Sequence, residues 1–221
     1  MGDTPRGAFI QRDKETYAIV PKISMGLIDA DTMSRIADVV KKYNIPIIKI
    51  TSAQRIALVG IKPEDVEKIW EDLGMEVGPA VGLCVHYVQA CPGTAVCKYG
   101  VQPSLTLGAE LDKLFLGYEL PAKFKIGVSG CPMNCGEAPV RDLGIYGKKS
   151  GWTLMFGGNS GTHARIGDVI AENLTDGQAI ELARKCLEVY KANAKPRERT
   201  GRFMNRFGVE EFKKAVLGSE E

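Results

Sequence analysis

The chain has 221 residues, of which 44% are hydrophobic and 25% are charged, and its net charge at pH 7 is +2. This composition is ordinary for a globular protein, and the length allows one large domain or two small ones. No apolar run reaches the length of a membrane span, and the N-terminus lacks a signal-peptide core. The charge is too small to indicate nucleic-acid binding by itself. We therefore expect a cytoplasmic protein with reduced thiols, bound neither to a membrane nor to nucleic acid.

The first half of the sequence alternates between strand and helix patterns. Residues 1–16 are polar and predict a loose arm, and the β-branched run 17–24 predicts a strand. Apolar residues at helical spacing predict one helix over 31–43, capped by Asp29 or Asp31, and another from Pro63 to Gly74. Further strands are predicted at 45–51, at 55–61 and within 77–88. The β-α-β-β-α-β order is that of a ferredoxin-like split βαβ unit, so we expect a first domain over residues 1–80.

The second half, residues 81–221, predicts a mixed α/β domain. A helix is expected over 105–116, and strands are expected over 123–128, 143–146 and 152–156. A glycine-rich loop, GGNSGTHARIGD, leads to an amphipathic helix over 175–193 with Thr175 as a candidate cap. A basic stretch, KPRERTGRFMNRFG, precedes a short helix over 209–217. The predicted fold class is therefore α+β, with a ferredoxin-like half-domain followed by a mixed α/β domain.

Four cysteines form two close pairs, Cys91 with Cys97 and Cys131 with Cys135. Both pairs lie among Gly, Pro, Asn and Ser residues, which place them on loops or helix starts. Thiolates in this arrangement suit an iron–sulfur cluster, zinc or copper. A structural zinc site usually has about two to four residues inside each pair, so the wider first pair argues against zinc. The known ferredoxin spacings do not match either, which favours a cluster in some other class of protein.

The motif C-x5-C followed by C-x3-C, with G-C-P-x-N-C in the second pair and LPxKFK just before it, resembles the sirohaem and iron–sulfur half of the sulfite and nitrite reductases. A weaker similarity extends from about Tyr17 to Leu217. The resemblance implies a [4Fe–4S] cluster held by Cys91, Cys97, Cys131 and Cys135. In that family the last of these cysteines also bridges to the sirohaem iron. The implied reaction is the six-electron reduction of sulfite to sulfide, or of nitrite to ammonia.

Basic residues are the candidates for binding the small oxyanion. Lys123 and Lys125 alternate with Phe124, so a strand would project both ammonium groups to one face. The resemblance assigns both lysines to the substrate cage, and it matches Lys22 and Lys49 to basic positions of the ferredoxin-like half. A solvated strand face is the alternative for such a pair, but its position just before the second cysteine pair favours the site.

Sirohaem bears many carboxylates, so its pocket must be rich in cations and backbone donors. The candidates are Arg55, Arg141, Lys148, Gly157, Gly158, Asn159, Arg165, Arg197 and Arg199. The glycine-rich loop lacks the pattern of a nucleotide-binding phosphate loop, and the basic stretch lacks the interleaved aromatic residues of a nucleic-acid site. The arginine that the family carries shortly before the first cysteine is not evident here, and His86, Tyr87 and Gln89 occupy that neighbourhood. We interpret His86 as a structural histidine, with proton donor or axial iron ligand as alternatives. Cys84 and Cys186 are expected to be small core residues.

Larger members of the family contain two homologous halves around one active site, whereas this chain has one of each domain. The resemblance therefore implies either a more open site or a homodimer, and we expect self-association. No flavin or nicotinamide motif is visible, so electrons would come from a separate donor protein such as a ferredoxin. Two other classes stay open, an iron–sulfur electron carrier without sirohaem and a zinc-stabilised binding module.

Overall fold

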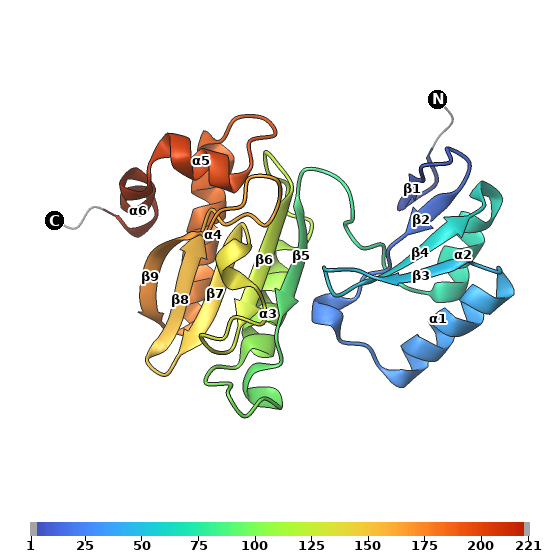
Figure 1. The fold of residues 1–221 in the computed structure, drawn as a ribbon, viewed down its shortest axis with the longest axis horizontal. Helices are drawn as coiled ribbons and strands as arrows, with labels where there is room; N and C mark the ends of the chain where they lie inside the picture. The colour runs from blue at the N-terminus through green and yellow to red at the C-terminus, as the bar shows by residue number, and fades with distance from the viewer. Residues whose placement is uncertain (1–3, 219–221) are drawn as a thin grey trace. The chain divides into compact units, whose positions relative to one another are not determined.

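The computed structural model describes residues 4–218, and the chain divides into two compact units between Val81 and Gly82 (Figure 1). The first unit contains a four-stranded antiparallel sheet with the order β1-β2-β4-β3. Two helices, α1 and α2, pack together against it. The bounds of these elements are β1 Ala8–Ile10, β2 Tyr17–Ile19, α1 Ala30–Lys42, β3 Ile47–Ile50, β4 Ile56–Ile61 and α2 Val66–Leu73.

Local sequence signals explain both helices of the first unit. Asp29 caps α1, because its side chain accepts a hydrogen bond from the backbone N–H of Thr32. Gly74 ends α2 in the left-handed conformation that glycine adopts without strain. The inward faces of the helices bury Ile36 and Ile69 against Leu58 of the sheet, which forms the core of this unit.

The strand content of the first unit differs from the prediction in two places. The N-terminal arm was expected to be loose, but Ala8–Ile10 forms β1 and pairs with β2. The last strand of the predicted β-α-β-β-α-β series, Val85–Ala90, instead belongs to the second sheet as β5. A strand of three residues such as β1 is too short to show alternating apolar residues, so the sequence pattern missed it. The fourth strand of the predicted series was therefore assigned to the apolar run that forms β5. It is the pairing with β2 that makes residues 8–10 a strand.

The second unit is built on a five-stranded sheet with the order β5-β6-β7-β8-β9. Strands β5, β6 and β7 are parallel, and β8 and β9 continue the sheet in antiparallel fashion. The elements are β5 Val85–Ala90, α3 Ser104–Phe115, β6 Phe124–Ser129, β7 Leu143–Lys148, β8 Gly151–Phe156, β9 Asp168–Leu174, α4 Asp176–Asn193, α5 Thr200–Phe207 and α6 Val209–Leu217.

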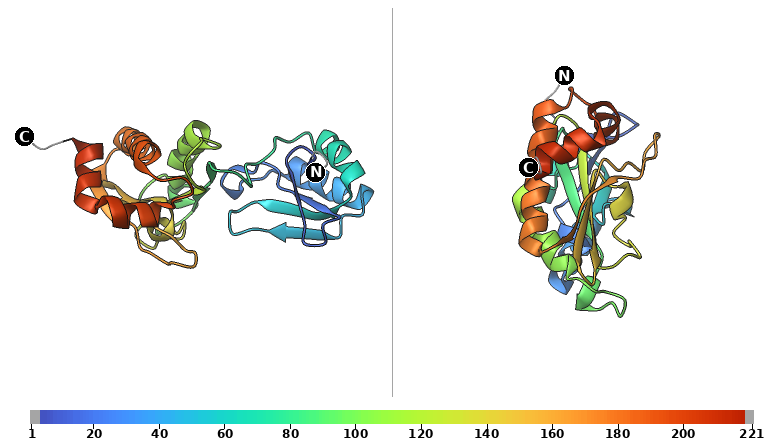
Figure 2. Two further views of the ribbon diagram at one scale, coloured as in Figure 1. Left: turned by 90° about the horizontal axis from the view of Figure 1, so that it is seen from above. Right: turned by 90° about the vertical axis from the view of Figure 1, so that its left-hand side faces the viewer.

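The two faces of this sheet have different characters. Helices α3 and α4 cover one face, which is apolar and includes Phe124, Trp152 and Phe156 (Figure 2). Tyr190 of α4, Phe203 of α5 and Phe212 of α6 complete an aromatic cluster there. The opposite face is polar, because the residues that alternate with the core positions include Tyr87, Gln89, Lys125, Ser129 and Thr153. The fold therefore offers a polar face backed by a rigid core.

The C-terminal helices follow the sequence with one exception. Thr175 and Gln178 form a capping box at the start of α4, as the candidate cap predicted. Helix α6 has the predicted bounds. The basic stretch between them is not a plain loop, since it contains α5, whose Phe203 and Met204 are buried. Among the helices that the structure describes, none is long and apolar enough to cross a membrane.

Candidate functional site

The two cysteine pairs lie at the carboxyl ends of neighbouring parallel strands. Cys91 follows β5 and Cys131 follows β6, and these strands pair side by side. The backbone N–H of Gly130 donates to Cys91 Sγ at 3.1 Å, and Val101 N–H donates to Gly130 O at 2.8 Å. Thus the two cysteine loops are bound to each other, and the thiol of Cys91 already accepts a backbone hydrogen bond of the kind that stabilises a thiolate ligand.

The exposure of the four cysteines suits a cluster near the protein surface. Cys131 is buried, Cys91 and Cys97 are half-buried, and Cys135 is exposed, and all four are free thiols. Within residues 4–218 no three His, Cys, Asp or Glu side chains converge closely enough to ligate a single metal ion. The donor set itself, four free thiols on two adjoining loops, is of the soft kind that iron–sulfur clusters take.

The segment from Cys131 to Arg141 connects β6 to β7 by crossing the polar face of the sheet. Gly136 N–H donates to Ser129 Oγ at 2.9 Å, and a Cβ on Gly136 would collide with the carbonyl of Val128. Gly144 of β7 meets the backbone of Ala138 in the same way. These glycines let the crossover lie directly on the strands. The crossover therefore leads from the last two cysteines to Arg141 within a few residues.

Tyr87 and Asp142, near the amino-terminal ends of β6 and β7, have three cations beside them: Lys125, Arg141 and Arg199. Lys125 Nζ lies 6.0 Å from the centre of the Tyr87 ring, and Arg141 Cζ lies 5.7 Å from it. Arg141 is buried, donates to Gln89 Oε1 at 2.9 Å and pairs with Glu137. Its Nε is buried without a partner, so the guanidinium still has a donor to offer. Burial, with Lys123, Arg141 and Arg199 nearby, lowers the pKa of Lys125.

Asp142 holds the side chain of Arg199 and the backbone of Lys125 in place. Its carboxylate is buried and accepts hydrogen bonds from Arg199 at 2.9 and 3.0 Å, from Thr200 Oγ1 at 2.5 Å and from the backbone N–H of Lys125 at 2.9 Å. Burial raises the pKa of Asp142, and the Arg199 and Thr200 contacts act in the opposite direction. The side chain thus joins the start of α5 to the start of β6. No sequence signal singled out Asp142, because one acid before a strand is unremarkable in a pattern.

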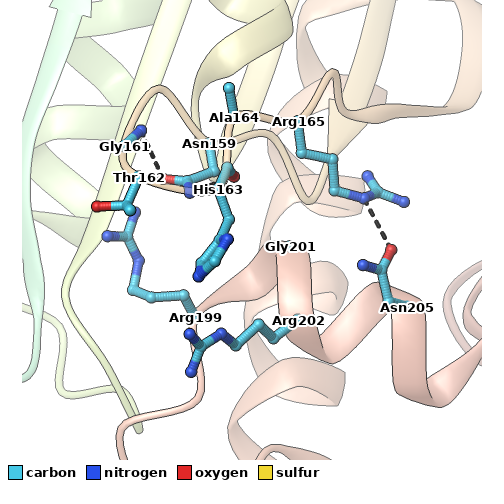
Figure 3. A pocket seen from close by; sticks show the side chains of 10 residues that line it. All are labelled: Asn159, Gly161, Thr162, His163, Ala164, Arg165, Arg199, Gly201, Arg202 and Asn205. Atoms are coloured by element: carbon cyan, nitrogen blue, oxygen red, sulfur yellow. Dashed lines mark hydrogen bonds between the residues drawn. The ribbon is translucent and has the colours of Figure 1, made fainter.

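A pocket of about 500 Å³ opens beside these cations, between the glycine-rich loop and α5 (Figure 3). Its cationic lining residues are Arg165, Arg199 and Arg202, and His163 points from the loop towards the start of α5. None of the lining residues is Asp or Glu. This chemistry matches a polycarboxylate such as sirohaem. The lining includes the predicted residues Asn159, Arg165 and Arg199. It also includes His163 and Arg202, which no pattern singles out although they lie in the glycine-rich loop and the basic stretch.

Gly157 and Gly158, also predicted, shape the wall of this region. Gly157 has a φ of +85° and donates its N–H to Asp142 O at 2.9 Å. A Cβ on Gly158 would collide with the carbonyls of Pro139 and Arg141. The glycine-rich loop therefore packs against the crossover segment. Arg165 is held by Asp168 at 2.7 Å and by Asn205 at 3.1 Å, so part of its role is to fix this loop to α5.

The remaining predicted site residues lie elsewhere. Lys123 is exposed immediately before β6. Lys148 pairs with Glu172 at 2.6 Å at the opposite end of β7 from Arg141, and Arg197 is exposed and does not line the pocket. In the first unit, Lys22 pairs with Glu76 at 2.7 Å, Lys49 is exposed on β3, and Arg55 is buried and donates to Pro79 O at 3.1 Å.

The next three residues are those for which the sequence favours a structural role. His86 is buried, and its Nε2 lies 2.9 Å from Gly82 O. Cys186 is buried in α4 and Cys84 is half-buried, and burial raises the pKa of both thiols. Neutral thiols of this kind are poor metal ligands, in agreement with their interpretation as packing residues.

Comparison with known families assigns the chain to a class. Residues 81–221 match the nitrite and sulphite reductase 4Fe-4S domain, and residues 9–76 match the nitrite/sulfite reductase ferredoxin-like half domain. The chain therefore belongs to the nitrite and sulfite reductase family, whose members are oxidoreductases with sirohaem and a [4Fe–4S] cluster as cofactors. The ferredoxin-like and mixed α/β fold class predicted from the sequence is confirmed.

Within this family, the chain is similar to several individual proteins. It is 54% identical to an assimilatory-type sulfite reductase of Nitratidesulfovibrio vulgaris, over 99% of this chain and 100% of that protein. It is 42% identical to an NAD(P)H nitrite reductase of Bacillus subtilis, over 97% of this chain but only 26% of that protein. A dissimilatory sulfite reductase structure matches with a TM-score of 0.81 at 13% identity, covering 93% of this chain and 70% of that one. The Mycobacterium tuberculosis NirA structure matches with a TM-score of 0.80 at 18% identity, covering 91% of this chain and 39% of that one, and both confirm the fold.

Proposed function

We propose that this protein reduces sulfite to sulfide with six electrons, using a [4Fe–4S] cluster held by Cys91, Cys97, Cys131 and Cys135 together with sirohaem. The observation that carries the proposal is the crossover from Cys131 to Arg141, which joins two thiol donors to a group of cations on one face of the sheet. A pure electron carrier has no need of such cations. The full-length similarity to an assimilatory-type sulfite reductase supports the same reading.

Once bound, the cofactors would pass electrons from the donor to sulfite and would provide the iron at which it binds, and the chain would supply positive charge and protons. Lys123 and Lys125 would hold the oxyanion and give protons to the oxygens that leave as water. The lowered pKa of Lys125 suits that role, because its ammonium releases a proton more readily than an exposed lysine does. The anion-binding roles that the resemblance assigns to Lys22 and Lys49 of the first unit stay predictions.

The cationic pocket is the proposed holder of sirohaem carboxylates. Arg199, Arg202 and His163 line it, and Arg165 and Asn159 fix its loop. Arginine suits this role because its planar guanidinium donates two parallel hydrogen bonds to a carboxylate. Arg141, with its unused Nε donor, is the next candidate. Residues 81–221 would thus contain both the four cluster ligands and this pocket.

Nitrite reduction to ammonia is the second candidate, supported by the similarity to nitrite reductases. Both substrates are small oxyanions that the same lysines and arginines would bind, so substrate preference has to be measured. We further propose that the protein takes electrons from a separate donor protein, self-associates, and works in the cytoplasm, where cluster-forming thiols stay reduced.

The test begins with protein purified without oxygen. Its UV–visible spectrum should contain sirohaem bands together with broad cluster absorption, and reduced methyl viologen should then drive sulfite and nitrite turnover. We expect a higher kcat/KM for sulfite. A higher value for nitrite would move the assignment to the second candidate. Cluster absorption without sirohaem would leave an electron carrier, and a colourless zinc protein would refute the proposal.

A matched pair of variants then tests the lysine assignment. Lys125→Gln removes the half-buried ammonium, and Lys113→Gln removes an exposed one from α3. We expect the first to lower kcat/KM for sulfite by about 10²-fold, which is typical of a lost proton donor. The second should leave kcat/KM unchanged. Equal values in the two variants would remove Lys125 from the anion site.

A further inference from the structure

The loop around Cys97 exposes apolar side chains on both sides of that cysteine. Val96 is 81% exposed and Tyr99 is 63% exposed. The loop is nevertheless well held, because Cys97 N–H donates to Gly93 O at 3.0 Å and Gly100 N–H donates to Cys97 O at 3.0 Å. Val96 and Tyr99 therefore present ordered apolar surface to solvent next to a proposed cluster ligand.

The same end of the sheet carries positive charge. Lys98 follows Cys97 and lies 4.9 Å from the centre of the Tyr99 ring, and Lys149 lies at the exposed turn between β7 and β8. The turn is tied to the cysteine loop, since Gln102 Nε2 donates to Lys148 O at 2.8 Å. Segments 92–104, 130–136 and 147–151 contain no Asp or Glu. Within the described part of the chain, neither Lys98 nor Lys149 forms an ion pair, whereas Lys148 is neutralised by Glu172.

We infer that Val96, Lys98, Tyr99 and Lys149 form the docking surface for an acidic iron–sulfur carrier protein that delivers electrons one at a time. This inference rests on the proposed function, because it takes Cys97 as a cluster ligand. In each encounter the reduced carrier loses one electron, the cluster gains it, and the oxidised carrier leaves; six encounters supply one sulfite. An apolar centre with a charged rim and a small area is the composition of such transient interfaces.

The proposed docking surface lies away from the proposed substrate and sirohaem sites. The proposed substrate cations and the sirohaem pocket lie towards the amino-terminal ends of β6 and β7, whereas the Cys97 loop lies at their carboxyl ends. A carrier at the Cys97 loop would therefore leave the anion site open to sulfite. Opposite charges on the two proteins would steer the encounter, and the rate of association would fall as salt screens them.

The probe is a plant-type [2Fe–2S] ferredoxin, an acidic carrier, with the full-length cofactor-loaded protein as its partner. Calorimetry with the oxidised ferredoxin gives Kd without turnover, at low salt and at physiological salt. The variants are Lys98→Glu, Lys149→Glu and their combination, and Lys185→Glu on the exposed side of α4 is the matched control. Because Lys149 is remote in sequence from the cysteines, its variant separates docking from damage to the cluster. Stopped-flow reduction by ferredoxin and by methyl viologen completes the comparison.

We expect the double variant to weaken ferredoxin binding at low salt by at least about tenfold and to lose most of the salt dependence. The control should stay within about twofold of the parent, and reduction by methyl viologen should be unchanged in Lys149→Glu. Equal Kd values for parent and double variant, or no binding by the parent at low salt, would overturn the inference. Failure of the proposed function looks different, since viologen-driven sulfite reduction would then be absent whatever the ferredoxin Kd.

Discussion

Asp142→Asn should destabilise the second unit more than any other conservative change near the site. The carboxylate is 1% exposed and receives donors from Arg199, Thr200 and the backbone of Lys125. An asparagine of the same size keeps one oxygen but turns an NH₂ group towards donors. It also leaves the guanidinium of Arg199 without its counter-charge. The substitution therefore combines a broken buried ion pair with an unsatisfied donor.

The magnitude follows from those contacts. Removing one partner of a buried ion pair costs about 3–5 kcal/mol, and a buried donor without an acceptor costs ~1–3 kcal/mol. Arg199 is 31% exposed, so water offsets part of its loss. We therefore expect the free energy of unfolding to fall by about 3–4 kcal/mol. Glu172→Gln is the control, because it breaks the exposed pair with Lys148 and should cost below ~1 kcal/mol.

The assay is urea unfolding followed by tryptophan fluorescence in a Trp70→Phe background. The sequence has two tryptophans, so Trp152, buried on the core face of β8, then reports the second unit alone. Parent and variants are compared in the same cofactor-free state, with equal m-values as the check on a common transition. A loss below about 1 kcal/mol for Asp142→Asn would refute the view that this carboxylate organises the site.

Three further changes probe the other parts of the site. Cys135→Ser should abolish bound cluster iron, measured by iron analysis and visible absorption, whereas Cys84→Ser should retain it. Because the pKa of Lys125 is lowered, its ammonium loses its proton at a lower pH than that of an exposed lysine, so sulfite turnover should decline on the alkaline side below pH 10.5. Lys125→Arg should remove this alkaline decline, and a pH profile identical to that of the parent would contradict the assignment. Gly136→Ala should destabilise by about 1–3 kcal/mol because its Cβ meets the Val128 carbonyl, while Gly177→Ala, with open space around it in α4, should be neutral or stabilising in urea unfolding.

The sequence was most informative where one local signal determines the outcome. The spacing of the four cysteines and the LPxKFK motif led to the correct family, and Asp29, Gly74 and the Thr175 capping box set helix ends that the structure confirms. These signals lie within a few residues of one another. Neither pairing partners nor long-range burial is needed to interpret them.

Features that depend on distant segments were not predictable in this way. Strand β1 exists because β2 pairs with it, and the buried side of α5 is visible only once Phe203 meets the aromatic cluster of α4 and α6. Asp142 gains its importance from Arg199 and Thr200, which follow it by more than fifty residues. The pocket residues His163 and Arg202 come together for the same reason.

The crossover from Cys131 to Arg141 has a consequence for how the site can vary. Its glycines leave no room for side chains beneath it, so the segment cannot slide along β6 without a backbone collision. The thiol donors and the Arg141 guanidinium therefore lie at the two ends of one segment whose length and path are fixed. Insertion or deletion of a single residue would displace both ends at once. Any change of substrate preference in this scaffold should consequently come from the lysines and the pocket loop, while the length of the crossover stays fixed.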